Sequence, residues 1–231
     1  MNKKKVLVTG GTRGIGKSIF ELFKKNGYDV YITGTSLPEI PNEKYYQVDF
    51  SNSESFEKFI FDISSKKFDI LINNVGTNII KNQSDVSIVE WSKMIDVNLK
   101  SIYFISQSIL KNMPSGGKII NISSIFGVVS KELRSLYSTT KFGINGLTKS
   151  LSLEYAHKNI LINSISPGFT NTELTSKSLT EEQSSELKKQ VPLNRFAEPN
   201  EIAELVFFLS SEKNSYITGQ NIIIDGGFTI K

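Results

Sequence analysis

Tyr137 and Lys141 are the residues whose types and spacing most directly suggest chemistry. Three residues separate them, so they lie on one face of any helix that contains both. A tyrosine phenol has an ordinary pKa of about 10 and is a slow acid or base near neutral pH. A neighbouring ammonium group favours the phenolate and lowers that pKa, which suits the phenol to exchange a proton with an alcohol or carbonyl oxygen. The same spacing alone is also typical of an ordinary pair on a helix surface.

A second candidate for chemistry is the glycine-rich segment at residues 9–16. It follows a short apolar run, Val6–Val8, and opens an amphipathic stretch, Ile15–Lys25. Glycines in such a place allow a tight turn and close approach of the backbone to a pyrophosphate, which the N–H groups of the following helix bind. The segment lacks the Gly-Lys-Ser/Thr ending of an ATP- or GTP-binding P-loop. The pattern favours dinucleotide binding over a purely structural turn.

The elements that position these residues follow from an alternation of short apolar runs with longer amphipathic stretches. We expect strands at Val6–Val8, Val30–Thr33, Tyr45–Val48, Ile70–Asn73, Lys118–Ile122, Ile160–Ile165 and Asn221–Ile224. We expect helices at Ile15–Lys25, Ser53–Ser65, Ile88–Asn112, Ser135–His157 and Asn200–Ser210. This alternation predicts βαβ units, and continuous apolar strands predict helices on both faces of the sheet. The fold class is therefore α/β, with a single-domain, doubly wound parallel sheet of Rossmann type over residues 1–231.

One connection departs from this alternation. Pro38 and Pro41 lie between the second and third expected strands. Two prolines in so short a span leave no room for a crossover helix. We expect a loop over residues 34–46 instead.

Composition excludes several classes of site. The chain of 231 residues has no cysteine and one histidine, His157, so disulfides, a cysteine nucleophile and a multi-histidine metal site are excluded, and no metal is expected. His157 lies in a polar stretch where a solvated or helix-capping role is expected. The net charge of +4 favours acidic ligands such as phosphorylated cofactors. The sequence has no block of basic residues, so no nucleic-acid partner is expected. With no apolar run of about 18 residues and no signal-like segment, we expect no membrane partner and a cytoplasmic location.

The motifs together resemble the short-chain dehydrogenase/reductase family. Besides the glycine-rich turn and Tyr137 with Lys141, the matching positions are Asn73–Gly76, Asn98, Asn121–Ser124, Pro167–Gly168, Ile217–Gln220 and Asp225–Gly227. They occur in family order and at family spacing over nearly the whole sequence. The resemblance implies an oxidoreductase that interconverts a carbonyl and an alcohol with a nicotinamide cofactor.

The resemblance assigns roles to four catalytic residues. Tyr137 is the proton donor, and Lys141 lowers its pKa and binds the nicotinamide ribose. Ser124 hydrogen-bonds the substrate oxygen and stabilises charge that develops there. Asn98 holds a water that links Lys141 to solvent as a proton relay. All four residue types are present at the family positions.

The sequence favours NADP(H) over NAD(H) as the cofactor. Relatives that select NAD usually carry an acidic residue after the second strand. Here Thr35 and Ser36 occupy that region, and the first carboxylate after the strand is Glu39. Arg13 pairs well with a 2′-phosphate, although a solvated loop arginine is the alternative. By resemblance, cofactor contacts are expected from Gly10, Thr12, Arg13, Gly14, Ile15, Gly16, Thr35, Ser36, Asp49, Phe50, Asn74, Gly76, Tyr137, Lys141, Pro167, Gly168, Thr170 and Thr172.

The substrate is less closely specified. The C-terminal half resembles 3-oxoacyl-[acyl-carrier-protein] reductases, which implies a 3-oxoacyl thioester. Lys158 matches one basic residue that docks the acidic carrier, but Ser115 stands where the other would be. The segment Thr77–Lys81 looks more like reductases of small cyclic ketones or polyols, and a sugar is also an alternative. Acyl carrier protein is therefore a doubtful partner.

Further expectations concern the pocket and the assembly. Residues 170–194 are polar and are expected to form a substrate lid. Ile125, Phe126 and Phe169 are candidates for an apolar pocket, with ordinary core packing as the alternative. Relatives form tetramers through the helices that here contain Asn98 and Tyr137, so a homotetramer is expected by resemblance. A protein that senses NADP(H) without catalysis is the alternative of another class, because a fold does not define a function.

Overall fold

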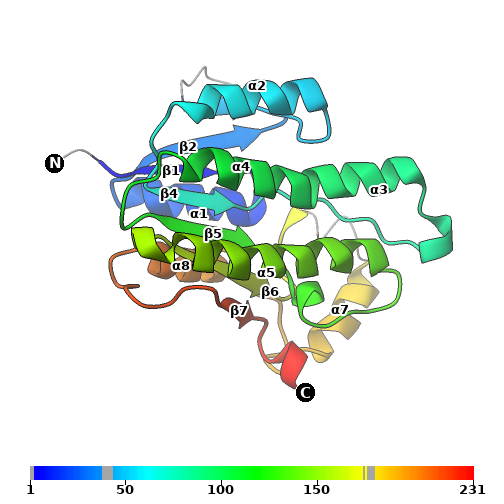
Figure 1. Cartoon of the computed structure of the whole chain (residues 1–231). Helices are drawn as coiled ribbons and strands as arrows, with labels where there is room; N and C mark the ends of the chain where they lie inside the picture. Colours follow the sequence, from blue (N-terminus) through cyan, green and yellow to red (C-terminus); the bar gives the residue numbers. More distant parts are fainter. Residues whose placement is uncertain (1–2, 38–43, 174, 176–179) are drawn as a thin grey trace.

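A seven-stranded parallel sheet forms the centre of the molecule (Figure 1). The structure, a computed structural model, describes residues 3–37, 44–173, 175 and 180–231. The strand order is β3-β2-β1-β4-β5-β6-β7, which confirms the doubly wound sheet expected from the sequence. The strands are β1 (Lys5–Val8), β2 (Asp29–Gly34), β3 (Tyr45–Gln47), β4 (Ile70–Asn73), β5 (Lys118–Ile122), β6 (Leu161–Pro167) and β7 (Asn221–Ile224).

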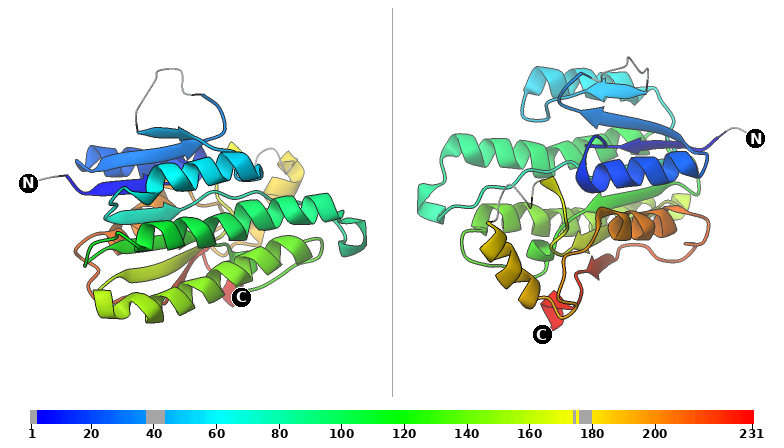
Figure 2. Two further views of the ribbon diagram at one scale, coloured as in Figure 1. Left: turned by 45° about the horizontal axis from the view of Figure 1, so that its top comes forward. Right: turned by 180° about the vertical axis from the view of Figure 1, so that it is seen from behind.

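Helices cover both faces of this sheet (Figures 1 and 2). One face carries α2 (Ser53–Ser64), α4 (Ser101–Leu110) and α5 (Ser135–Tyr155), and the other carries α1 (Gly14–Lys25) and α8 (Pro199–Ser210). Among the described residues, the other helical elements include α3 (Ile88–Ile95), α7 (Glu181–Lys189), the π-helical η2 (Asp96–Lys100), and the short 3-10 turns η1 (Gln83–Asp85), η3 (Ile125–Gly127), η4 (Ala156–Lys158) and η5 (Phe228–Ile230).

The sheet divides the apolar core into two layers. Along β1, Leu7 packs into the layer under α2 and α4, whereas Val6 and Val8 pack into the layer under α1 and α8. Alternation of this kind is required because successive side chains of a strand point to opposite faces. All three side chains are fully buried, so both faces of the strand must be apolar.

Two expected elements differ from the structure. The helix predicted over 88–112 is interrupted, because α3 and α4 are joined by the π-helical η2. A π-helical turn adds a residue without changing the hydrophobic pattern visibly, so periodicity does not reveal it. In contrast, α7 is a helix within the segment for which only a polar lid was predicted, and Thr180 caps it by accepting a hydrogen bond from the Gln183 amide.

The loop predicted over 34–46 falls largely outside the described residues. No helix is present among the described residues of this connection, which are Thr35–Leu37 and Lys44. Residues 38–43 lie outside the part of the chain that the structure describes.

Buried amides join the sheet to the helices on one face. The side-chain amide nitrogen of Asn73 on β4 donates to the Asn121 side-chain oxygen on β5 at 2.8 Å and to Ser106 on α4 at 3.1 Å. The Asn121 amide nitrogen in turn donates to Thr148 on α5 at 2.9 Å. Because buried polar groups are costly unless they are paired, this chain of bonds specifies how α4 and α5 sit on the sheet.

The strand order also locates a crevice. The chain runs outward from β1 in both directions, to β2 on one side and to β4 on the other, so connections leave the carboxyl ends of β1 and β4 toward opposite faces. Ligands of doubly wound sheets bind at such a point. The glycine-rich turn follows β1, and the Asn74–Gly76 segment follows β4, so both border this crevice. None of the described helices is long and apolar enough to cross a membrane.

Candidate active site

The glycine-rich turn is held in a shape that only small residues allow. A Cβ on Gly16 would lie 2.1 Å from the carbonyl oxygen of Gly10 and 2.5 Å from the Asn74 side-chain nitrogen. That nitrogen donates to the carbonyl oxygens of Thr9 and Gly10 at 3.0 and 3.1 Å. Arg13 is the N-cap of α1 and its side chain makes no capping bond, so the first amides of α1 face the crevice without a side-chain partner from that position. The turn therefore fits a pyrophosphate.

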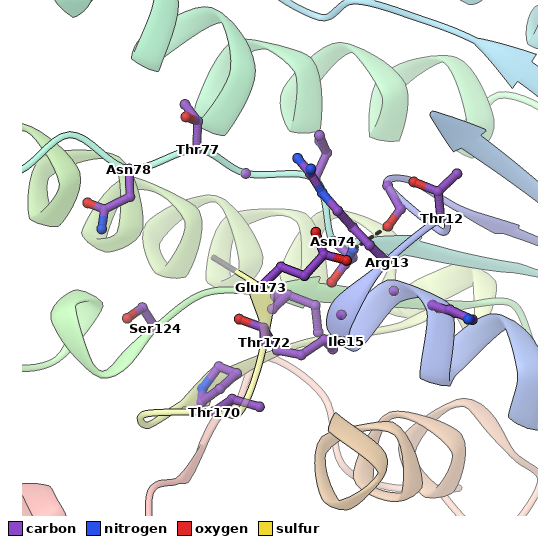
Figure 3. Close-up of a pocket in the computed structure, with 18 of the residues that line it drawn as sticks. Thr12, Arg13, Ile15, Asn74, Thr77, Asn78, Ser124, Thr170, Thr172 and Glu173 are labelled. Atoms are coloured by element: carbon purple, nitrogen blue, oxygen red, sulfur yellow. Dashed lines mark hydrogen bonds between the residues drawn. The ribbon is translucent and has the colours of Figure 1, made fainter. Parts of the chain in front are cut away.

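A cavity of about 870 Å³ extends from this turn to the carboxyl ends of β4, β5 and β6. Figure 3 shows Thr12 and Arg13 beside the turn and Ser124 across the cavity from them. Every predicted cofactor residue except Asp49 lines the cavity, as do the predicted catalytic residues Ser124, Tyr137 and Lys141. The three residues predicted for an apolar pocket, Ile125, Phe126 and Phe169, also line it. The length of the cavity is suited to a dinucleotide with a substrate at one end.

Asp49 is not among the described residues that line this cavity. Its carboxylate accepts hydrogen bonds from the Ser51 amide at 2.9 Å and the Ser51 hydroxyl at 2.7 Å. These bonds lower the pKa of the Asp49 carboxyl from its ordinary value. Its neighbours Val48 and Phe50 line the cavity, and the adenine contacts of Asp49 and Phe50 stay a prediction.

Tyr137 and Ser124 meet at the substrate end of the cavity. The Ser124 hydroxyl is near enough to the Tyr137 hydroxyl to affect its pKa, and the Ser124 oxygen accepts from the Phe126 amide at 3.2 Å. Burial raises the pKa of Tyr137 from its ordinary value, while the Ser124 hydroxyl and the positive charge of Arg134 act in the opposite direction. Tyr137 is therefore a neutral phenol at neutral pH and has a proton to give.

Lys141 lies one helical turn beyond Tyr137 and is almost completely buried, with 3% of its surface exposed. Its ammonium nitrogen donates to the Ile122 carbonyl oxygen at 3.0 Å and lies 5.6 Å from the centre of the Tyr137 ring. Burial lowers the pKa of Lys141 to about 8. The two side chains thus share one helix face, as the spacing predicts, while the effect of Lys141 on the pKa of Tyr137 stays a prediction.

Asn98 lies behind the cavity wall in the π-helical η2. Its side-chain oxygen accepts from the Thr77 amide at 2.8 Å, and its nitrogen donates to the Thr77 carbonyl at 2.9 Å and to Thr140 at 3.2 Å. A Cβ on Gly76 would lie 3.7 Å from the Asn98 oxygen and from the Lys141 nitrogen, so these two side chains approach the same glycine. Asn98 therefore holds the segment after β4 beside Lys141. Its role in a proton relay stays a prediction.

The far end of the cavity carries cationic and hydroxyl groups. Arg13, Thr35 and Ser36 line it together. The Tyr45 hydroxyl donates to the Ser36 carbonyl, and the Gln47 side chain donates to the Thr35 carbonyl at 3.1 Å, so β3 fixes the backbone after β2. Glu173 is the one carboxylate among the described residues that line the cavity, and it lies on the segment after β6. No acidic side chain of the described residues stands at the end of β2, which suits a phosphate at this position.

Several lining residues were not identified from the sequence, among them Tyr45, Asn78 and Arg134. Tyr45 and Asn78 follow from their places after β2 and β4 only once the fold is known. Arg134 is the N-cap of α5 and lies outside the helix, so helical spacing alone did not place it in the cavity. Among the described residues, no cluster of three or more His, Cys, Asp or Glu side chains could hold a metal ion.

A parallel doubly wound sheet, a phosphate-binding turn at its crevice and a tyrosine–serine–lysine set that lines the same cavity define a nicotinamide-dependent oxidoreductase that acts on an alcohol or a carbonyl. The chain belongs to the short-chain dehydrogenase/reductase family: residues 10–229 match the family model described as enoyl-(acyl carrier protein) reductase. This finding confirms the family resemblance seen in the sequence motifs.

Two curated relatives and one solved structure illustrate the range of similar proteins. The chain is 40% identical to a 3-oxoacyl-[acyl-carrier-protein] reductase FabG from Aquifex aeolicus (strain VF5), over 96% of this chain and 95% of the relative. It is 35% identical to a NAD-dependent glycerol dehydrogenase from Listeria innocua, over 99% of this chain and 94% of the relative. The solved structure of ElxO with NADP bound is 31% identical, with a TM-score of 0.88 and all of both chains covered.

Proposed function

We propose that this protein uses NADP(H) to reduce a ketone to a secondary alcohol, with Tyr137 as the proton donor. The observation that carries the proposal is that Tyr137, Ser124 and Lys141 line one cavity together with the glycine-rich turn. Because the pKa of Tyr137 is raised, the phenol is protonated at neutral pH and can act as an acid.

The residues of this chain divide the work of the reaction. The glycine-rich turn and the first amides of α1 bind the pyrophosphate, and Arg13 pairs with the 2′-phosphate. When bound, the nicotinamide cofactor supplies a hydride to the carbonyl carbon. Ser124 donates a hydrogen bond to the carbonyl oxygen, and Tyr137 gives that oxygen its proton. Lys141 positions the nicotinamide ribose.

Replacing Tyr137 with phenylalanine tests the proton-donor assignment. The variant keeps the ring and its packing against Phe126, whose ring centre is 6.4 Å away, but loses the hydroxyl. We expect NADPH oxidation with a panel of ketones to fall by about 100-fold or more, the usual contribution of a general acid. NADPH binding, followed by the fluorescence of the bound cofactor, should stay within about threefold. Retained turnover in the variant would remove Tyr137 from this role.

The choice of NADP(H) over NAD(H) is tested at Arg13. The ElxO structure contains NADP, whereas the Listeria relative is named as NAD-dependent, so relatives of both kinds exist. The wild type should prefer NADPH to NADH by kcat/KM, and Arg13→Ala should reduce that preference by weakening NADPH alone. Equal use of both cofactors by the wild type would refute the proposal.

Two groups of substrates remain candidates. A 3-oxoacyl thioester corresponds to the Aquifex aeolicus relative, and a polyol, a sugar or a small cyclic ketone corresponds more closely to the Listeria innocua glycerol dehydrogenase. Docking of an acyl carrier protein rests on Lys158, which is exposed. A sensor without catalysis would bind NADPH but would not oxidise it, whichever substrate is added. Its behaviour would not change on Tyr137→Phe.

Two further expectations belong to this proposal. Leu187 of α7 and Thr175 line the cavity, which supports a lid formed by residues 170–194, although residues 174 and 176–179 lie outside the described part of the chain. Large apolar side chains exposed on α4 and α5 support a homotetramer assembled through these helices. The cytoplasmic location stays a prediction.

A further inference from the structure

Arg134 presents a positive charge beside the catalytic tyrosine. It precedes α5 directly, lines the cavity and is half-buried. The carbon of its guanidinium lies 5.2 Å from the centre of the Phe126 ring, and that ring centre lies 6.4 Å from the centre of the Tyr137 ring. Arg134 and Tyr137 therefore both pack against Phe126 at the substrate end of the cavity.

The guanidinium of Arg134 has no carboxylate partner in the part of the chain that the structure describes. Burial lowers the pKa of Arg134, and the Tyr137 hydroxyl acts in the opposite direction. Arg195, in contrast, donates to both carboxylate oxygens of Glu201 at 2.7 Å. Removing a cation from water without an opposite charge is unfavourable, and the planar guanidinium edge is suited to binding a carboxylate or phosphate in two places. The contrast points to a partner that comes with the substrate.

The loop before α5 holds Arg134 in place. Leu133 has a φ of +64°, a left-handed conformation that is unfavourable for leucine. Its carbonyl oxygen accepts from the Lys81 amide at 3.3 Å, and the Arg134 amide donates to the Lys131 carbonyl at 3.3 Å. Strained backbone of this kind persists where the surrounding structure imposes it, and it is concentrated at functional sites.

We infer that Arg134 binds an anionic group of the substrate, a carboxylate or a phosphate, so that the protein reduces a small anionic ketone. This inference rests on the proposed function. Arg134 and Tyr137 both pack against the Phe126 ring, so an anion bound by Arg134 lies on the same side of the cavity as a carbonyl oxygen held by Tyr137 and Ser124. A 3-oxoacyl thioester offers a neutral carbonyl there, and a neutral acceptor pairs less strongly with a guanidinium than an anion does.

Kinetics with matched substrates test the inference. Acetoacetate and its methyl ester share the ketone and differ in charge, and dihydroxyacetone phosphate and dihydroxyacetone differ in the same way. The wild type should prefer the anionic member of at least one pair. Arg134→Gln should lower kcat/KM for that anion by about 10- to 100-fold, the range expected for a hydrogen bond to a charged group, and change the neutral member by less than about threefold. Arg134→Lys should give an intermediate loss.

Lys149→Gln is the matched control. It removes the same charge from an exposed position on α5 that does not line the cavity, and it should leave both pairs unchanged. Equal losses for anionic and neutral ketones in Arg134→Gln, with a shifted pH profile, would show that Arg134 acts only on the pKa of Tyr137 and would overturn the inference. A wild-type preference for the neutral members would overturn it as well.

A binding measurement separates this inference from the proposed function. Malonate and inorganic phosphate are titrated into the Tyr137→Phe protein with NADPH bound, and cofactor fluorescence is followed. At least one anion should bind, and adding Arg134→Gln should weaken it by about 10-fold or more. Binding through Arg134 in a protein that reduces no ketone would refute the proposed function alone. Tyr137-dependent turnover of neutral ketones, with neither anion bound, would refute this inference alone.

Discussion

Burial lowers the pKa of the Lys141 amine and at the same time reduces the stability of the folded protein. In water its amine would have a pKa of 10.5, and in the fold burial lowers that pKa to about 8. Each unit of pKa shift corresponds to about 1.4 kcal/mol, so the charged amine costs the folded state about 3 kcal/mol below pH 8. The hydrogen bond to the Ile122 carbonyl returns about 1 kcal/mol of this.

Lys141→Met should therefore stabilise the protein while abolishing activity. The unfolded state binds more protons than the folded state between pH 8 and 10.5, so the wild type gains stability as pH rises through this window. The variant has no amine at this position, so its stability does not change with pH for this reason. Urea unfolding should show it to be more stable than the wild type by about 1–2 kcal/mol at pH 7, with the difference disappearing toward pH 10. A difference that does not change with pH would contradict this account.

At the scale of elements, the loop between η3 and α5 determines which charge reaches Tyr137. Leu133 turns the chain into α5 in a left-handed conformation, and this conformation costs about 1–2 kcal/mol for most L-residues. Asparagine tolerates it better, because its short polar side chain forms local hydrogen bonds. The Leu133 side chain is 42% exposed, so little apolar burial is lost on its removal.

Leu133→Asn should raise the free energy of unfolding by about 0.5–1 kcal/mol without loss of activity. Leu133→Ala is the control, since it removes the same apolar surface and keeps the penalty for a left-handed residue. Chemical denaturation of both variants at one pH measures the effect. If alanine and asparagine gave equal stability, the backbone of residue 133 would not be strained.

At the scale of the whole molecule, α4 and α5 leave large apolar side chains uncovered. Tyr103 and Phe104 on α4 and Phe142 and Leu153 on α5 are between 40% and 81% exposed. The two helices lie side by side on one face of the sheet (Figure 1). Exposed apolar groups that gather on neighbouring elements mark interfaces between proteins.

Leu153→Glu should disrupt the proposed tetramer, because assembly would bury a charge in an apolar interface. Sedimentation velocity should show the wild type as a tetramer and this variant as a smaller species that keeps its helical circular dichroism. Phe61→Glu is the control, since Phe61 is 78% exposed on α2, outside these two helices. A wild type that sediments as a monomer would refute the tetramer.

The sequence by itself determined the features that depend on neighbouring residues. Apolar runs with β-branched residues specified the strands, the glycine spacing specified the turn after β1, and the four-residue spacing placed Tyr137 and Lys141 on one helix face. These follow from local backbone geometry, which repeats every few residues. The doubly wound sheet was predictable for the same reason, because alternating strands and helices allow few arrangements.

Only the tertiary structure decided which groups surround Tyr137. The raised pKa of Tyr137 arises from burial, and the opposing effects come from Ser124 after β5 and Arg134 before α5. The π-helical turn at Asn98 and the hydrogen bond from Ser51 to Asp49 were equally invisible in the sequence. Desolvation and charge depend on distances between segments far apart in the chain, and residue spacing does not encode those distances.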